Sequence, residues 1–410
     1  MLQNNPFLLR LVGDKYTDLY PYDLVLDEGI SRLYRAELTV LTDECHTQYK
    51  LVEDLLDQGI SMSISQSLQD GRTMRTRYLH GIITGVKSDG VFNTGPKPFY
   101  SHVFTIEPKL ARLRFTRSTR PFYQKTPLKI IEDILKGHQL LSSERLPSTY
   151  LTQFDDGSYM LFDQRGVSDL NFLQHILSLY GLSFTFQHKR LSGSLVDAEL
   201  FFSEGRTFPV SDIVYSDGRL IPAVMQFMYH AADEDQSLWK MDKWSMNEMI
   251  GVDGMELTAP YPDANYGSIG WYRGNSGAGR RSITYPSMFH RYQRDTDNKK
   301  INQDVSCILD ASYRTLHLAK SSWTGAAANL ALQPGSIFQL RGFYGTGNTT
   351  SLSAMVTALH LHCRARKPDG MVSSQDRDGG ELTEAQIRCA DYRDETGCNN
   401  KGWRFCADPR

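Results

Sequence analysis

The amino-acid sequence predicts an α+β protein that is mainly β, with two antiparallel β-barrel domains flanking an α/β domain. Short apolar runs that alternate with polar residues fill the first hundred residues and return beyond Asp212. Such a period of two is typical of strands with one buried face. Between the two runs, from Thr126, apolar residues recur at helical spacing.

The first hundred residues are predicted to form short antiparallel strands. Turn dipeptides at Asp70-Gly71 and Asp89-Gly90 bound one strand segment, as expected of hairpin connections. The stretch from Leu51 to Gln58 is predicted to be a helix that interrupts the strands. Short antiparallel strands with glycine turns favour a barrel, which we place at residues 1–112. The alternating apolar residues are Leu24, Leu26, Leu38, Val40, Ile60, Met62 and Ile64.

A helix opens the middle domain at Pro127, a residue that suits the first turn because proline has no N–H to satisfy. The pattern ends at Gly137. Its apolar face consists of Ile130, Ile131, Ile134 and Leu135.

A second helix in residues 162–186 leads directly into a strand. Ser168 can accept a hydrogen bond from a free amide at the helix start, and Asp169 places negative charge at the positive end of the helix. Gly181 ends the helix because glycine adopts the left-handed conformation at low cost. Together with the first helix, this unit predicts an α/β domain over residues 113–205. Its apolar residues are Leu170, Phe172, Leu173, Ile176, Leu177, Tyr180, Leu182, Phe184 and Phe186.

The second β-barrel is predicted at residues 206–363, with a long polar insert near 261–300. Ser336–Leu340 and Leu352–His362 alternate as strands, and Gln303–Leu318 shows a helical repeat.

Glycines in the insert resemble those of a phosphate-binding loop. Residues 261–282 hold five glycines next to Arg280 and Arg281. A nucleotide loop, however, needs glycines at set intervals and a Lys followed by Ser or Thr at the start of a helix. Here the tract runs into a strand-like segment, Ser282 to Tyr285, so we predict a mobile surface loop instead.

Composition and charge favour an ordinary soluble globular protein. The 410 residues contain 45 Lys and Arg against 47 Asp and Glu, and 40% are apolar. The nearly balanced charges create no electrostatic field that would attract nucleic acid, so we predict no nucleic-acid partner. No stretch approaches the length of a membrane span, and residues 1–12 lack the features of a leader peptide. We therefore expect no stable membrane anchoring, and assembly in the cytoplasm.

The six cysteines form no dense disulfide framework. Cys45, Cys307 and Cys363 are predicted to behave as small core residues. Cys389, Cys398 and Cys406 gather in the last 22 residues, but their spacings of nine and eight are too wide for the paired cysteines of a zinc site. A disordered or partner-bound tail at residues 364–410 is expected, with a metal clip or disulfide loop as the alternative.

No catalytic, cofactor-binding or metal-binding residue is assigned. His80 precedes a glycine in a strand and is predicted to be structural. His360 and His362 share one face of the last strand, but no third metal ligand is identifiable, and we expect them to pack against the barrel or a partner subunit. Paired carboxylates for sugar hydrolysis exist at Asp155-Asp156 and Asp233-Glu234-Asp235, yet nothing fixes the separation that such chemistry needs.

The order of several segments resembles one family, the type VI secretion system spike protein (valine-glycine repeat protein G), with the related hub of contractile phage tails. The resemblance covers about residues 7–363. The segments that carry it are Ile30–Leu38, His80–Val86, a run of apolar and aromatic residues from Phe104 to Leu135, the Ser168-Asp169-Leu170-Asn171-Phe172 helix start, Leu332–Leu340 and Val356–His360.

The resemblance implies a mechanical function and no enzyme activity. In that family two barrels per subunit pack as a homotrimer, so that six similar barrels form a ring. The ring seats on a hexameric tube protein while its other face carries a threefold spike, which resolves a symmetry mismatch. Expected partners are further copies of the chain, the tube protein, baseplate components and a separate needle, spike tip or effector. The assembled hub would be secreted or delivered with the injection apparatus.

One departure separates this chain from complete spike proteins, which continue into a small oligonucleotide-binding-type barrel and a repeating β-helix needle. After Cys363 a polar, glycine- and aspartate-rich stretch follows instead. Either the needle is a separate protein, or the needle-bearing end has been lost or removed.

Two other functions remain open. A monomeric β-rich ligand-binding module would use the same barrels without assembling. A carbohydrate-degrading enzyme would need paired carboxylates in a cleft.

Overall fold

The computed structural model describes part of the chain. The described residues are 7–12, 18–43, 53–67, 74–92, 98–123, 125–140, 159–190, 197–203, 208–218, 222–229, 239–248, 254–260, 268–274, 280–284, 290–292, 321–327, 329–342, 352–365 and 382–391.

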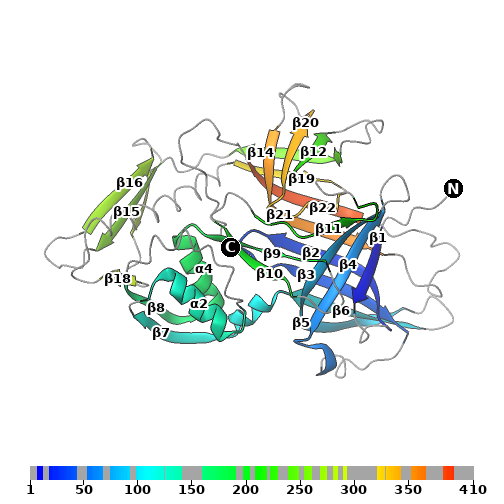
Figure 1. Cartoon of the computed structure of the whole chain (residues 1–410), viewed down its shortest axis with the longest axis horizontal. Helices are drawn as coiled ribbons and strands as arrows, with labels where there is room; N and C mark the ends of the chain where they lie inside the picture. Colours follow the sequence, from blue (N-terminus) through cyan, green and yellow to red (C-terminus); the bar gives the residue numbers. More distant parts are fainter. Residues whose placement is uncertain are drawn as a thin grey trace.

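A sheet of 14 strands forms the larger part of the molecule (Figure 1). Its main path runs β1-β4-β5-β6-β3-β2-β21-β20-β12-β13, and β22, β19 and β14 extend from β21 as a branch, while β11 pairs with β5. The strands are β1 (Phe7–Val12), β2 (Tyr20–Gly29), β3 (Arg35–Thr42), β4 (Gly59–Ser67), β5 (Met74–Phe92), β6 (Phe99–Glu107), β11 (Ile213–Tyr215), β12 (Val224–Tyr229), β13 (Trp239–Met241), β14 (Lys243–Glu248), β19 (Ser321–Ala326), β20 (Ile337–Arg341), β21 (Leu352–Arg364) and β22 (Leu382–Asp391).

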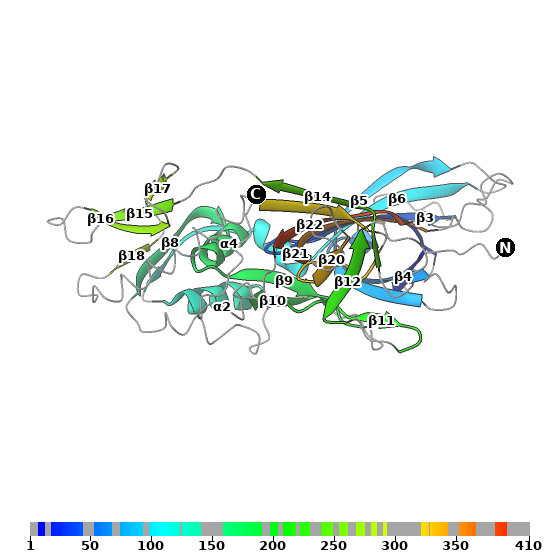
Figure 2. The same ribbon diagram turned by 90° about the horizontal axis from the view of Figure 1, so that it is seen from above.

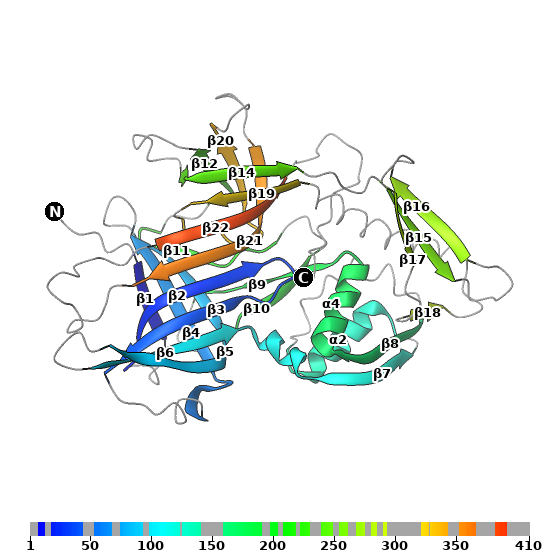
Figure 3. The ribbon, with the colours of Figure 1, turned by 180° about the vertical axis from the view of Figure 1, so that it is seen from behind.

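The prediction of two closed antiparallel barrels was wrong for the described strands. β2 from the first half pairs with β21 from the second, from Asp23 opposite Arg364 to Gly29 opposite Ala358, and Figure 3 shows the two strands side by side. The path from β1 to β13 stays open among the described strands. Parallel pairing of β12 with β13 and β20 makes the sheet mixed. Alternation of apolar residues predicts strands but not which strand edges meet, so the joining of both halves was not foreseen.

One apolar core serves both halves of this sheet, and its members come from β2 to β6 as well as from β12 to β21. All seven alternating residues named for the first hundred positions are buried, which confirms their strand assignment. Cys363 belongs to this core, and burial raises the pKa of its thiol to about 12. The predicted helix from Leu51 to Gln58 is helical only at residues 53–55 among those described.

The middle unit contains two helices over a three-stranded sheet and confirms the predicted helices. The strands are β7 (Arg117–Tyr123), β8 (Tyr159–Ser168) and β18 (His290–Tyr292); the helices are α2 (Pro127–Gly137) and α4 (Asp169–Leu179), and a 3-10 helix, η2 (Lys109–Arg114), precedes them. The Ser168 hydroxyl accepts a hydrogen bond from the Asn171 amide at 3.2 Å, as the sequence predicted. Gly181 has φ +66°, the left-handed value expected after the helix. The apolar faces of both helices share a second core.

A strand hairpin links this unit to the large sheet, and Figure 2 shows the two parts at opposite ends of an elongated molecule. The hairpin consists of β9 (Ser183–Gln187) and β10 (Glu199–Ser203). The backbone amide of Ser31, in the turn after β2, donates to the Phe184 carbonyl at 2.7 Å. The hairpin is therefore hydrogen-bonded directly to the turn that follows β2.

The polar insert contains strands, so the loop prediction for residues 261–282 was wrong in part. β15 (Gly254–Pro260), β16 (Ser268–Gly274) and β17 (Arg280–Thr284) form a separate three-stranded sheet. The strand-like character of the residues from Ser282 onward is confirmed in β17. Glycine-rich sequence has low strand propensity, so the strands of the insert depend on backbone hydrogen bonds between them.

Some sequence predictions lie outside the described residues. They are the helical repeat in Gln303–Leu318, the carboxylates Asp155, Asp156, Asp233, Glu234 and Asp235, and the cysteines Cys45, Cys307, Cys398 and Cys406. Cys389 lies in β22.

Candidate interaction groove

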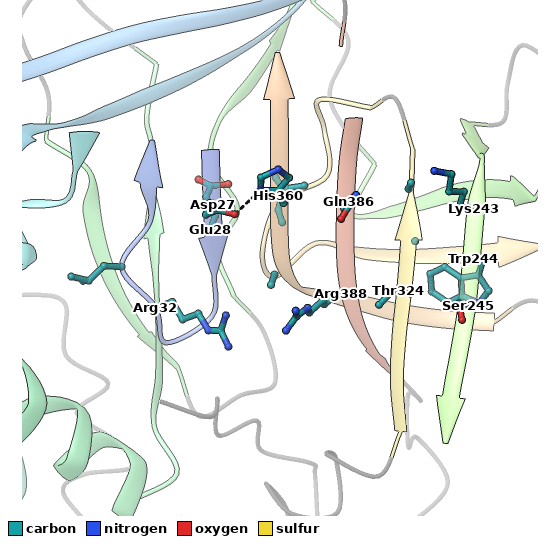
Figure 4. Close-up of a pocket in the computed structure, with 15 residues that line it drawn as sticks. Asp27, Glu28, Arg32, Lys243, Trp244, Ser245, Thr324, His360, Gln386 and Arg388 are labelled. Atoms are coloured by element: carbon teal, nitrogen blue, oxygen red, sulfur yellow. Dashed lines mark hydrogen bonds and ion pairs between the residues drawn. The ribbon is translucent and has the colours of Figure 1, made fainter. Parts of the chain in front are cut away.

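A groove of about 750 Å³ lies over one face of the large sheet. Figure 4 shows its floor, formed by the adjacent strands β2, β21, β22, β19 and β14. Residues from positions 27 to 388 meet there, so the groove exists only because the two halves of the chain share a sheet.

Strand register arranges the floor in two rows, because side chains two positions apart on a strand project from the same face. We call them the Asp27 row and the Arg388 row. Across the five strands the Asp27 row consists of Asp27, His360, Gln386, Ala326 and Lys243. The Arg388 row consists of Gly29, Ala358, Arg388, Thr324 and Ser245.

Arg388 is the one long side chain in its row, and its neighbours are small. At the end of the row, Gly29 carries no side chain, and Arg32 from the following turn fills that space. A Cβ atom on Gly29 would lie 3.2 Å from Arg32 Cδ, which is closer than ordinary van der Waals contact. Figure 4 shows the guanidinium groups of Arg32 and Arg388 pointing toward one another across the groove. Both residues are exposed.

Histidines of β21 bind aspartates of β2. His360 Nδ1 lies 2.7 Å from Asp27 Oδ1, and His362 Nε2 lies 2.7 Å from Asp23 Oδ1. The sequence predicted that the two histidines share a face, but it placed them against apolar or subunit contacts. Their partners are more than 300 positions away in the chain, so no local pattern indicates these pairs. Among the described residues no group of three or more His, Cys, Asp or Glu is placed to hold a metal ion.

The side of β2 opposite the Asp27 row carries a buried ion pair. Glu28 binds Arg77 of β5, with side-chain exposures of 7% and 1%. His188, which follows β9, is fully buried, and its Nε2 atom lies 3.9 Å from Glu28 Oε1. We call Glu28, Arg77, His188 and His80 the Glu28 cluster. The Glu28 cluster joins β2, β5 and the residues that follow β9. It lies on the side of β2 opposite the Asp27 row.

Hydrogen bonds fix both the ring and the backbone of His80 within this cluster. Its Nδ1 atom lies 2.9 Å from Ser61 Oγ, and its Nε2 atom lies 2.7 Å from the Lys189 carbonyl. Its backbone N–H donates to His188 Nδ1 at 3.1 Å. The Tyr34 hydroxyl donates to the His80 carbonyl. The Ser61 hydroxyl beside its ring is itself buried, at 1% exposure, so the pair does not face solvent, and the contacts of His80 position backbone rather than substrate.

Gly81 is required by the close approach of neighbouring elements. A Cβ atom at this position would lie 2.7 Å from the Glu107 carbonyl oxygen and 3.0 Å from the Tyr34 hydroxyl. The His80-Gly81 motif therefore has a packing explanation in this fold.

Burial sets the protonation of the histidines. Desolvation lowers the pKa of His188 well below its ordinary value, and the charges of Arg77 and His80 lower it further. Desolvation also lowers the pKa of His80. Both imidazoles are therefore neutral at neutral pH, which spares the cluster a second buried cation beside Arg77.

Acidification is expected to destabilise the protein through His188. Its folded pKa lies below the unfolded value of 6.5, so the unfolded chain binds a proton first. The His188 contribution is complete above pH 6.5 and is lost as the pH falls below it, by about 1.4 kcal/mol for each pH unit. Urea denaturation midpoints between about pH 7.5 and about pH 5 measure this loss. His188→Asn keeps an acceptor for the His80 amide and should flatten the dependence; parallel curves for the variant and the unchanged protein would contradict the assignment.

None of the described helices is long and apolar enough to cross a membrane.

Residues 27–203 match the family model of the phage tail baseplate hub (GPD). The type VI secretion system spike protein VgrG2b of Pseudomonas aeruginosa is 28% identical over 162 residues, which are 38% of this chain and 14% of that protein. The chain thus spans a small part of the curated relatives that it matches.

Solved structures share the fold over nearly the whole chain. The E. coli c3393 protein, a component of the type VI secretion system with structural similarity to T4 bacteriophage tail proteins gp27 and gp5, matches with a TM-score of 0.53 at 12% identity and covers 94% of this chain and 77% of that one. The tail protein of Neisseria meningitidis MC58 gives 0.55 at 10% identity, over 94% and 97%.

Proposed function

This chain is related to the type VI spike proteins and carries a phage tail baseplate hub region at residues 27–203, and from that premise we propose that it is a structural hub of a contractile injection apparatus. The family match carries the proposal. It begins in β2 and ends at β10, so it takes in β3 to β6, the two helices of the middle unit and the β9–β10 hairpin. The shared fold with a type VI secretion component and with the Neisseria meningitidis tail protein extends the support over 94% of the chain.

The hub acts as a homotrimer that matches a hexameric tube to a threefold spike. Three copies with two related strand-rich modules each present six nearly equal contacts to the tube. Its other partners are baseplate components and a separate needle, spike tip or effector. It is assembled in the cytoplasm and then delivered with the apparatus.

The pairing of strands from both halves of the chain suits a protein that transmits force. β2 hydrogen-bonds to β21 along seven residue pairs, from Asp23 to Gly29. A load on either half therefore passes through backbone hydrogen bonds instead of a flexible linker. We propose module boundaries at 1–112, 113–205 and 206–363, with 364–410 as a further segment that contributes β22 to the large sheet, and no catalytic role for any of them.

Mass in solution tests the assembly. Size-exclusion chromatography with light scattering should give three times the chain mass of 46.6 kDa. The purified trimer should then retain the hexameric tube protein in a pull-down. A particle of one chain would favour the ligand-binding module and would contradict the hub. Turnover of glycan or peptidoglycan by the purified protein would contradict a purely structural role.

A further inference from the structure

We propose that the groove of Figure 4 binds an extended, acidic segment of a partner protein, with Arg32 and Arg388 binding its carboxylates. This site lies on the sheet face described above, and its occupancy is independent of whether the chain forms a trimer or seats on a tube.

Charge in the groove is unbalanced. The carboxylates of Asp27 and Glu28 already have basic partners: Asp27 binds His360, and Glu28, which faces the other side of β2, binds Arg77. Neither Arg32 nor Arg388 has an ion pair within the described part of the chain. Two guanidinium groups that point toward one another repel each other, so the arrangement favours a negatively charged occupant. A planar guanidinium suits a carboxylate because it can donate two parallel hydrogen bonds.

The small residues of the Arg388 row leave room for a main chain between the two arginines. Ala358 separates Arg388 from the Gly29 position that Arg32 covers. On the other side, Thr324 and Ser245 offer hydroxyl groups that can donate to or accept from a peptide backbone. Gln386 in the Asp27 row adds an amide.

The length of the groove matches a short peptide better than a single anion. Neighbouring strands lie about 4.8 Å apart, so the floor from β2 to β14 measures about 19 Å. An extended chain advances about 3.3 Å per residue, and about six residues would therefore cross it. The volume of about 750 Å³ also exceeds what one phosphate or carboxylate fills and lies in the range of sites for larger ligands.

Fluorescence anisotropy with a fluorescein-labelled hexaglutamate peptide, at low ionic strength, tests the site on the full chain. The unchanged protein should bind the peptide, and added salt should weaken the binding. The double variant Arg32→Ser, Arg388→Ser should bind at least about tenfold more weakly, because two charge-assisted contacts are lost. Arg165→Ser is the matched control, since Arg165 is an exposed arginine of β8 that pairs with Asp163 away from the groove. Gly29→Ala, which crowds Arg32, should weaken binding without removing any charge.

Several outcomes would overturn the proposal. One is failure of the unchanged protein to bind hexaglutamate, and another is equal affinity of the double variant and Arg165→Ser. Competition by inorganic phosphate at the same concentration as unlabelled peptide would show a simple anion site instead. Loss of self-association in the double variant, measured by sedimentation, would identify a second copy as the occupant in place of a separate partner. Matching circular dichroism of the unchanged protein, the double variant and Arg165→Ser establishes that the exposed substitutions leave the fold intact.

Discussion

Replacement of Glu28 by alanine is expected to lower the free energy of unfolding by about 3–5 kcal/mol, because it leaves the Arg77 guanidinium buried without its carboxylate. The Arg77 side chain is 1% exposed. Its neighbour His188 is neutral and cannot supply a negative charge. Urea denaturation followed by tryptophan fluorescence gives the loss.

Glu37→Ala is the matched control for this change. Glu37 also pairs with an arginine, Arg35, but both side chains are about half exposed, at 49% and 55%. An exposed pair contributes about 0–1 kcal/mol, so the control should remain close to the unchanged protein. Equal losses in Glu28→Ala and Glu37→Ala would show that the Glu28 cluster is not buried as described. Adding Arg77→Met to Glu28→Ala should recover stability, because an apolar side chain replaces the unpaired cation.

Leu173→Asp is expected to unfold the middle unit, at a cost of more than about 4 kcal/mol. Leu173 lies on α4 and is fully buried in the second core. The substitution removes an apolar side chain, which costs about 2–5 kcal/mol, and it also buries a carboxylate without a partner. Limited proteolysis and the denaturation midpoint measure the effect. Asn171→Asp places the same carboxylate at an exposed position of the same helix and should change stability by less than about 0.5 kcal/mol.

A soluble Leu173→Asp protein with the midpoint of the unchanged chain would contradict the burial of α4. Aggregation of both aspartate variants would indicate a general sensitivity to charge and would not support the specific role of the apolar stripe.

Local patterns predicted the elements that depend on neighbouring residues. The Ser168 cap, the left-handed Gly181 and the buried stripe of α4 involve contacts within one helix and the strand after it, so their signals lie close together in the chain. The alternating strands of the first hundred residues were found for the same reason. The insert strand β16 was missed because glycine-rich sequence has low strand propensity. The local sequence also does not show that β16 pairs with β15.

The groove depended on contacts that no local pattern encodes. His360 was noticed, but its partner Asp27 was not, and neither Arg32 nor Arg388 was singled out. Gly29 could have pointed to Arg32, because a residue without a side chain leaves space for the methylene groups of the arginine. That signal has meaning only when Gly29 is known to lie opposite Ala358.

The sequence by itself determined the two helices of the middle unit, the alternating strands of the first hundred residues, their apolar faces, and the family that the order of the segments resembles. The tertiary structure decided that strands from both halves form one open sheet, that Glu28 meets Arg77, and that two arginines converge over a floor of small residues. The physical reason is that periodicity records the burial of each side chain, whereas the pairing of strand edges depends on hydrogen bonds between residues hundreds of positions apart.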